Sequence, residues 1–219
     1  TVPINQQESL VPTMSRLVEE IGFEVSEGAG DCFYTFSPLR SRQRVPEGNH
    51  LRLGPGIVEW ILSTPSGTLA RRFEAQLRAC DRFEIGEAAL PISGVERYSA
   101  PRFSRSARFT CAAPIVVGES TCIATCNCLP GGFSETLRAE LLRKYEALYG
   151  RSPRDTSLIV DLDNAYMAHK RWTKRVSFQG TYVEGIYCPF TVTGSPDLIR
   201  LGYLAGFGQR NQEGFGMAL

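Results

Sequence analysis

Two histidines are the side chains of this 219-residue chain best suited to move a proton near neutral pH, because imidazole titrates in that range. His50 lies in a predicted loop between Arg44 and Arg52, and His169 lies in the basic segment 168–175. An isolated histidine in a loop is more often incidental than catalytic. We therefore treat both residues as weak candidates for a general acid or base.

Seven cysteines offer a second kind of chemistry, as nucleophiles or metal ligands. Their number is odd and their spacing is not that of a secreted disulfide framework, so we expect most of them to be free thiols. The tight group Cys122-x3-Cys126-x-Cys128 lacks a fourth ligand, because both histidines are distant in sequence. The sequence therefore predicts no metal site and no cofactor, and an enzyme that uses this group is the least favoured alternative. The seven are Cys32, Cys80, Cys111, Cys122, Cys126, Cys128 and Cys188.

Arginine dominates the basic residues, since only three of the 24 are lysine, namely Lys144, Lys170 and Lys174. The guanidinium group is a planar fork of donors that suits phosphate. Clusters of it can bind a polyanion even where the net charge of the chain is only +1. The alternative is that they are solvated loop charges. The clusters are Arg40/Arg42/Arg44, Arg97/Arg102/Arg105/Arg108 and Lys170/Arg171/Lys174/Arg175.

A glycine-rich segment near the C-terminus is the most informative motif. Gly206, Gly208, Gly214 and Gly216 surround a polar stretch that contains Gln209, Arg210 and Asn211. Glycine permits positive φ and close approach of a phosphate, so the backbone can form an anion-binding nest to which Arg210 and Asn211 add donors. The alternative is a loose connection between a helix and a strand. The segment matches neither the P-loop nor the dinucleotide fingerprint.

The elements that must position these groups follow from hydrophobic periodicity. Helices are expected at 8–20, 68–80, 133–149 and 195–206, with Pro12 in the first turn of the first and Ser134 capping the third. The run 50–64 is expected to form two extended segments that meet at Gly54-Pro55-Gly56 and give a strand pair. Other extended segments are expected at 32–39, 82–90, 107–118, 158–163, 176–192 and 214–219.

The order α-β-β-α-β occurs twice, which predicts an α+β fold of two ferredoxin-like (βαββαβ, RRM-like) domains side by side. The N-terminal domain covers 1–104, and its first strand is incomplete unless residues 1–4 supply it. The C-terminal domain covers 105–219 and carries the glycine-rich loop.

Composition excludes several classes of protein. With 42% hydrophobic and 21% charged residues, the chain is neither disordered nor collagen-like nor a coiled coil. It has no run long enough to span a membrane and no signal-peptide pattern, so we expect an intracellular soluble protein without a membrane partner. It opens on Thr1 and stops within an apolar run at Leu219, which indicates a trimmed chain or one domain of a longer protein.

Six segments spread over nearly the whole chain form an ordered pattern: Val2–Asn5, Phe33–Leu39, Ala113–Val117, Leu142–Tyr149, Lys174–Gly185 and Gly206–Gly216. This pattern resembles the CRISPR-associated endoribonucleases that process precursor CRISPR RNA, a branch of the RAMP superfamily of tandem ferredoxin-like proteins. The resemblance implies a prokaryotic, cytoplasmic protein that binds CRISPR repeat RNA. It also implies metal-independent cleavage, in which the 2′-hydroxyl attacks and leaves a cyclic phosphate.

Residues for RNA binding are then expected among the basic clusters and the glycine-rich loop, with Trp172 as a stacking face for an unpaired base. They are Arg40, Arg42, Arg44, Lys170, Arg171, Trp172, Lys174, Arg175, Gly206, Gly208, Gln209, Arg210, Asn211, Gly214 and Gly216.

The chain departs from the family pattern at the usual catalytic histidine, where Glu19 stands, and a tyrosine found nearby in some members is replaced by Ser15. An exposed glutamate is ionised near neutral pH and cannot act as a general acid. Several alternatives therefore stay open. One is that the protein cleaves RNA with other groups, and another is that it binds repeat RNA but is catalytically inactive. A third is that it is a structural subunit of a surveillance complex. A fourth is that it is the RNA-processing domain of a larger assembly, which includes other CRISPR-associated proteins or a fused adaptation module.

Overall fold

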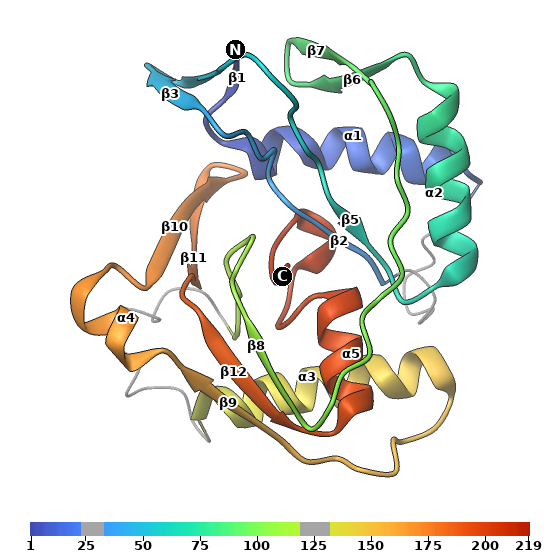
Figure 1. Ribbon diagram of the computed structural model, residues 1–219, viewed down its shortest axis with the longest axis vertical. Coiled ribbons are helices and arrows are strands. Elements are labelled where there is room, and N and C mark those ends of the chain that lie inside the picture. The colour runs from blue at the N-terminus through green and yellow to red at the C-terminus, as the bar shows by residue number, and fades with distance from the viewer. Residues whose placement is uncertain (23–32, 119–131) are drawn as a thin grey trace.

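The computed structural model describes residues 1–22, 33–118 and 132–219 and folds them around two main hydrophobic cores, one in each half of the chain (Figure 1). A connection without helix or strand runs between them, from β7 in the upper part of the view to β8 in the lower part. The predicted domain boundary at residues 104 and 105 falls within this connection and stays a prediction.

In the N-terminal half, two helices pack on small antiparallel sheets. The longer helix buries Leu10, Met14, Leu17 and Val18, whose spacing places them on one face. The sheets have the strand orders β1-β4-β3, β2-β5 and β6-β7. The elements are β1 (Val2–Pro3), α1 (Gln6–Glu20), β2 (Thr35–Phe36), β3 (Arg44–Glu47), β4 (His50–Leu53), β5 (Leu62–Ser63), α2 (Gly67–Ala79), β6 (Arg82–Ile85) and β7 (Ala88–Pro91).

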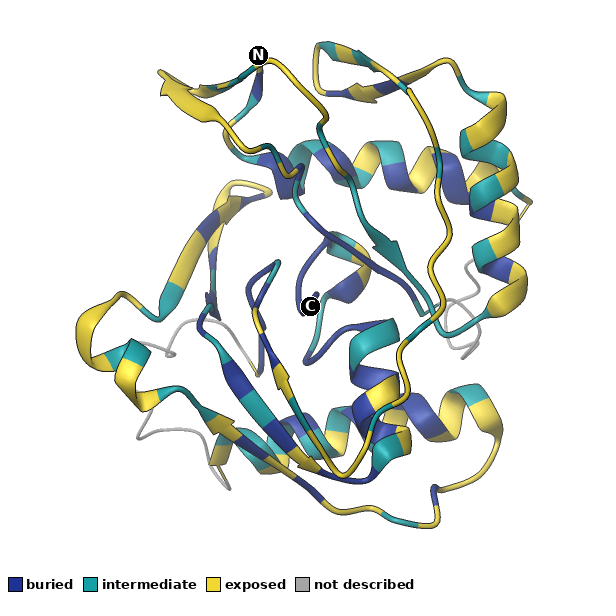
Figure 2. Cartoon of the chain, in the orientation of Figure 1, coloured by how far each residue is buried: buried dark blue, intermediate teal, exposed yellow. Residues whose placement is uncertain are grey.

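In the C-terminal half, two helices cover a three-stranded antiparallel sheet of order β8-β12-β9, and a separate hairpin, β10-β11, extends toward the N-terminal half. Buried residues on these helices and on the sheet belong to one hydrophobic core, and Figure 2 shows buried stretches on each of them. The elements are β8 (Ser106–Phe109), α3 (Gly132–Tyr149), β9 (Leu158–Leu162), α4 (Asn164–His169), β10 (Thr173–Phe178), β11 (Thr181–Ile186), β12 (Phe190–Gly194), α5 (Pro196–Ala205) and the 3-10 turn η2 (Asn211–Glu213).

The first turn of α1 and the β10-β11 hairpin hold the two halves together. Asn5 Nδ2 donates to Ser177 O at 2.5 Å, and Gln179 N donates to Glu8 Oε1 at 2.9 Å. Val11 of α1 packs against a small buried cluster that includes residues of this hairpin. The relative position of the halves is therefore fixed by both polar and apolar contacts.

Several details of the predicted elements are wrong. The two runs within 50–64 do not pair with each other, because β4 pairs with β1 and β3 whereas β5 pairs with β2. Ser134 does not cap α3: the helix begins earlier, and Ser134 Oγ instead bonds both to Val160 N and to Val160 O in β9.

Two further expectations also need correction. Because α1 begins at Gln6, Pro12 lies in its interior and not in its first turn. The expected last strand at 214–219 does not form: Gly214 and Gly216 have positive φ, and Ala218 alone in this segment forms a bridge, with Cys111.

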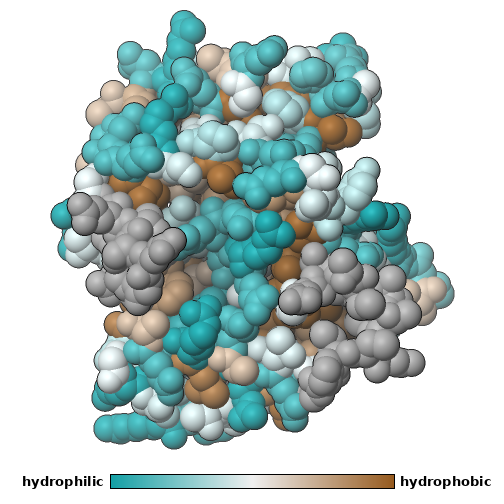
Figure 3. Space-filling model, turned by 180° about the vertical axis from the view of Figure 1, so that it is seen from behind, coloured by the Kyte–Doolittle hydropathy of each residue, from teal (hydrophilic) through white to brown (hydrophobic). Residues whose placement is uncertain are grey.

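On the rear face of the molecule, hydrophilic side chains predominate and hydrophobic ones occupy small scattered areas (Figure 3). Within the described ranges, every helix is too short or too polar to cross a bilayer.

Candidate functional site

A pocket of about 270 Å³ lies between the two halves of the chain. The N-terminal half contributes Gln7 from the first turn of α1 together with Arg40 and Arg44. The C-terminal half contributes Lys174 from β10 and Tyr187. The structure thus brings together parts of two basic clusters that are 130 residues apart in the sequence.

The cluster Arg40/Arg42/Arg44 lies on the segment that leads into β3. Backbone bonds between Arg40 and Glu59, at 2.8 and 2.9 Å, hold this segment in place. The three arginines are exposed, and none forms an ion pair with a described residue. Their donors are therefore available to an anion.

Lys174 reaches the pocket from the other side because of the alternation of side chains along β10. It lies on the same face of the hairpin as the buried Val176 and Phe178, while Arg175 lies on the opposite face. The Lys174 ammonium lies 5.1 Å from the centre of the Tyr187 ring. Loss of hydration and, second, repulsion from Arg44 lower the pKa of Lys174. Such a site favours a ligand that carries negative charge, because the ligand would relieve this repulsion.

The outer face of the same hairpin presents a cation stacked on an exposed aromatic ring. The guanidinium of Arg175 lies 4.1 Å from the centre of the Tyr182 ring, and Tyr182 is 60% exposed. Trp172, which the sequence suggested as a stacking face, is half-buried against the C-terminal core. Tyr182 is thus a further aromatic candidate that sequence reasoning missed, although its alternation with Val183 in a predicted strand was a usable signal.

The remaining basic residues of the 170–175 cluster are Lys170 and Arg171, which follow α4. Both are exposed and form no ion pair within the described ranges, and Lys170 Nζ lies 5.5 Å from the Tyr166 ring centre. In contrast, the third cluster is largely neutralised: Arg97 pairs with Glu74, Arg105 with Asp155 and Arg108 with Asp163. The unpaired clusters are therefore the better anion sites.

The glycine-rich loop packs against protein atoms. Gly208 has φ of 71° and lies against Val116, whose carbonyl accepts a bond from Gln209 N at 2.8 Å. Gly214 has φ of 80°, and a Cβ there would lie 2.6 Å from the Phe36 ring. The φ angles and tight packing of Gly206 and Gly216 are similar. The need for glycine therefore comes from internal packing, and contact of these four glycines with RNA stays a prediction.

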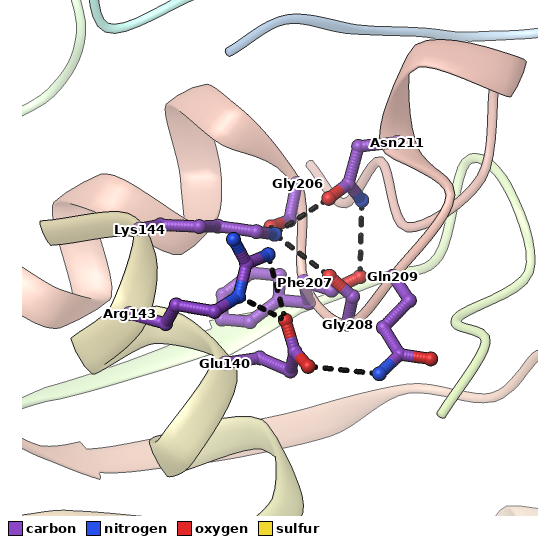
Figure 4. A network of polar contacts seen from close by, with 8 residues as sticks. All are labelled: Glu140, Arg143, Lys144, Gly206, Phe207, Gly208, Gln209 and Asn211. Carbon is purple, nitrogen blue, oxygen red and sulfur yellow. Dashed lines mark hydrogen bonds and ion pairs between the residues drawn. The ribbon is translucent and has the colours of Figure 1, made fainter. Parts of the chain in front are cut away.

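A buried lysine holds this loop from inside (Figure 4). Lys144 of α3 is 2% exposed, and its Nζ donates to Gly206 O and Gly208 O at 2.7 Å and to Asn211 Oδ1 at 2.5 Å. Three acceptors match the three N–H groups of an ammonium. Burial lowers the pKa of Lys144 to about 7, while Glu140 acts in the opposite direction.

The polar residues of the loop differ in what they can offer a ligand. Asn211 is buried and its amide bonds to Lys144, Phe207 O and Phe215 O, so its side chain does not supply the donors predicted for it. Arg210 pairs with Glu213 at 2.5 Å, and Gln209 Nε2 donates to Glu140 at 2.8 Å. Gln209 and Arg210 are half-buried and keep part of their surface open to solvent.

The candidate proton-transfer residues lie outside the pocket. His50 is exposed on β4, next to Leu51, which does line the pocket, and His169 is the exposed last residue of α4. Glu19 is exposed near the far end of α1, twelve residues after Gln7 or about 18 Å along the helix axis. Neither histidine therefore lines the pocket.

The structure describes three of the seven cysteines. Cys80 and Cys111 are free thiols, as expected, and burial raises the pKa of Cys111 to about 12, so that thiol is a poor nucleophile. Cys32 and the group Cys122, Cys126 and Cys128 lie outside the described residues. The described residues hold no group of potential metal ligands.

Comparison with known proteins decides the family. The model of the family "CRISPR associated protein Cas6, C-terminal" matches residues 98–218, which is more than half of the chain. The chain belongs to the Cas6 family. The matched region contains Lys144, the β10-β11 hairpin and the glycine-rich loop. The family predicted from the ordered motifs is therefore confirmed.

Relatives and solved structures agree with this assignment. The "CRISPR-associated endoribonuclease Cas6 1" of Methanocaldococcus jannaschii is 27% identical over 85% of this chain and 73% of its own length. A Cas6-related structure from Pyrococcus furiosus superposes with a TM-score of 0.84 over 100% of this chain and 91% of its own, at 19% identity. A structure titled "An RAMP protein binding different RNA substrates" superposes with a TM-score of 0.80 over 99% of this chain and 92% of its own, at 21% identity. The predicted α+β fold of tandem ferredoxin-like domains is confirmed.

Proposed function

We propose that this Cas6 protein is an RNA-processing endoribonuclease that binds unpaired CRISPR repeat RNA in the pocket between its halves. The observation that carries the proposal is the convergence of Arg40, Arg44 and Lys174, from both halves, on one pocket. The names of the relatives support it, because one is an endoribonuclease, one binds RNA substrates and another is a Cas6 product complex. Other protein partners stay a prediction.

The proposed reaction is attack of the 2′-hydroxyl on the adjacent phosphorus, with release of the 5′-oxygen and formation of a cyclic phosphate. This reaction needs a base for the hydroxyl proton, an acid for the leaving oxygen and cations for the charge on the phosphorane. His50 is the first candidate for proton transfer, because its neighbour Leu51 lines the pocket. His169 is the second, because it adjoins Lys170 and Arg171, which form no ion pair with a described residue. In this proposal Arg40 and Arg44, which line the pocket, supply the positive charge.

The test is incubation of the protein with end-labelled repeat RNA in EDTA. We expect one cut with a cyclic-phosphate end. We expect His50→Ala to slow cleavage by roughly 100-fold or more at unchanged RNA affinity, since positioned proton transfer contributes about 10²–10⁴. His169→Ala tests the alternative residue, and Cys80→Ala, at a half-buried site that does not line the pocket, serves as the control. Cleavage that persists unchanged in both histidine variants would contradict the proposed residues.

A second candidate function is binding of repeat RNA without cleavage. It is favoured by the position of Glu19, an exposed carboxylate that stands where the family pattern has histidine. The same experiment separates the two functions. Tight binding without any cut supports the inactive homologue, whereas a cut supports the endoribonuclease.

A further inference from the structure

One buried polar side chain that lines the pocket has a nitrogen without a hydrogen-bond partner in the described part of the chain. Gln7 is 3% exposed and lines the pocket, and its Nε2 has no hydrogen-bond partner among the described residues. The neighbouring Gln6 differs, because its Oε1 accepts a bond from Leu39 N at 2.6 Å. A buried amide left unpaired costs about 1–3 kcal/mol, so a protein gains little from one that has no ligand. The position of Gln7 therefore indicates a group that it binds.

Size and charge indicate what that group is. The pocket volume of about 270 Å³ is that of one nucleotide. Arg40, Arg44 and Lys174 are free of ion pairs with described residues and can bind a phosphate. Because Gln7 lies in the first turn of α1, the positive end of the helix dipole also favours an anion here. Three cations are sufficient for the phosphate, which leaves the amide for a different part of the nucleotide.

We propose that Gln7 reads the base of one unpaired nucleotide whose phosphate is bound by Arg40, Arg44 and Lys174. This inference rests on the proposed RNA binding and adds base discrimination to it. A primary amide carries a donor and an acceptor side by side, and the edges of the bases differ in the order of these groups. A phosphate offers acceptors only, so a side chain that contacted the backbone alone would not distinguish one base from another.

The test compares the affinities of oligoadenylate, oligocytidylate and oligouridylate of equal length for the wild type and for Gln7→Leu. We expect the wild type to prefer one of them by roughly fivefold to 100-fold, since a good bidentate contact discriminates by about that much. Gln7→Leu should bring the three affinities close together. Its melting temperature should be unchanged or raised, because leucine of similar size replaces an unpaired amide. A purely structural glutamine would instead make the variant less stable.

The matched control is Gln76→Leu on α2, which lies outside the pocket and should leave the preference unchanged. The inference is overturned if the wild type binds the three oligomers equally. It is also overturned if Gln7→Leu keeps the preference, or weakens all three affinities by the same factor. Failure of the wild type to bind repeat RNA and all three oligomers would instead refute the proposed function itself.

Discussion

Lys144 has an unusual environment for a single residue, because its ammonium is buried and its three acceptors among the described residues include no carboxylate. Burial, chiefly, lowers its pKa from an ordinary 10.5 to about 7. Between these two values the unfolded chain binds more protons at this site than the folded chain. The free energy of unfolding should therefore rise with pH above 7, by about 1 kcal/mol between pH 7 and pH 8.

Urea denaturation at pH 7 and pH 8 measures this effect directly. In Lys144→Met most of the rise should disappear, because the titrating group is gone. Lys170→Met, at an exposed lysine, should keep the rise. An equal rise in wild type and Lys144→Met would show that other groups cause it.

At the scale of elements, the glycine-rich loop is a packed connector between the halves and not an open turn. Thr35 Oγ1 of β2 donates to Phe215 O at 3.0 Å, and Gly214 lies against the Phe36 ring. Gly214→Ala should lower the free energy of unfolding by about 3 kcal/mol, since strain at positive φ and overpacking add. Gly150 also has positive φ, 64°, but a Cβ there would meet open space. Gly150→Ala should therefore lower the free energy of unfolding by only about 1 kcal/mol. Chemical denaturation measures both free energies of unfolding, and an equal decrease in the two variants would argue against tight packing at Gly214.

At the scale of the whole molecule, the halves must share the binding of RNA if the pocket is the site. Alanine at Arg40, Arg44 or Lys174 should each weaken binding. Each should also reduce the slope of log K against log salt by about 0.7, the value for one phosphate contact on a single strand. Arg97→Ala is the control, because Arg97 is paired with Glu74. Filter binding at several salt concentrations measures both quantities, and an unchanged slope in all three variants would place the RNA elsewhere.

The fold was more predictable than the site. The amphipathic spacing of α1, α2, α3 and α5 is a local property, and these helices begin within two residues of their expected starts. Strand partners depend on distant segments, which is why the pairing of 50–64 was wrong. The short α4 was missed because six residues give little periodicity. Of the candidate site residues, the basic clusters were identified by type, but which of them are neutralised depends on acids such as Asp155 and Asp163, far away in sequence.

By itself the sequence determined the family, the α+β class, the main helices and the identity of the basic clusters. Each of these depends on the order and spacing of residues that are near one another in the sequence. Only the tertiary structure decided that Arg44 and Lys174 share a pocket, that Lys144 is buried under the glycine-rich loop, and that Gln7 Nε2 has no hydrogen-bond partner among the described residues. Burial and pairing are set by residues that folding brings together from distant positions, such as Lys144 and Gly208, 64 positions apart in the sequence. No local pattern carries that information.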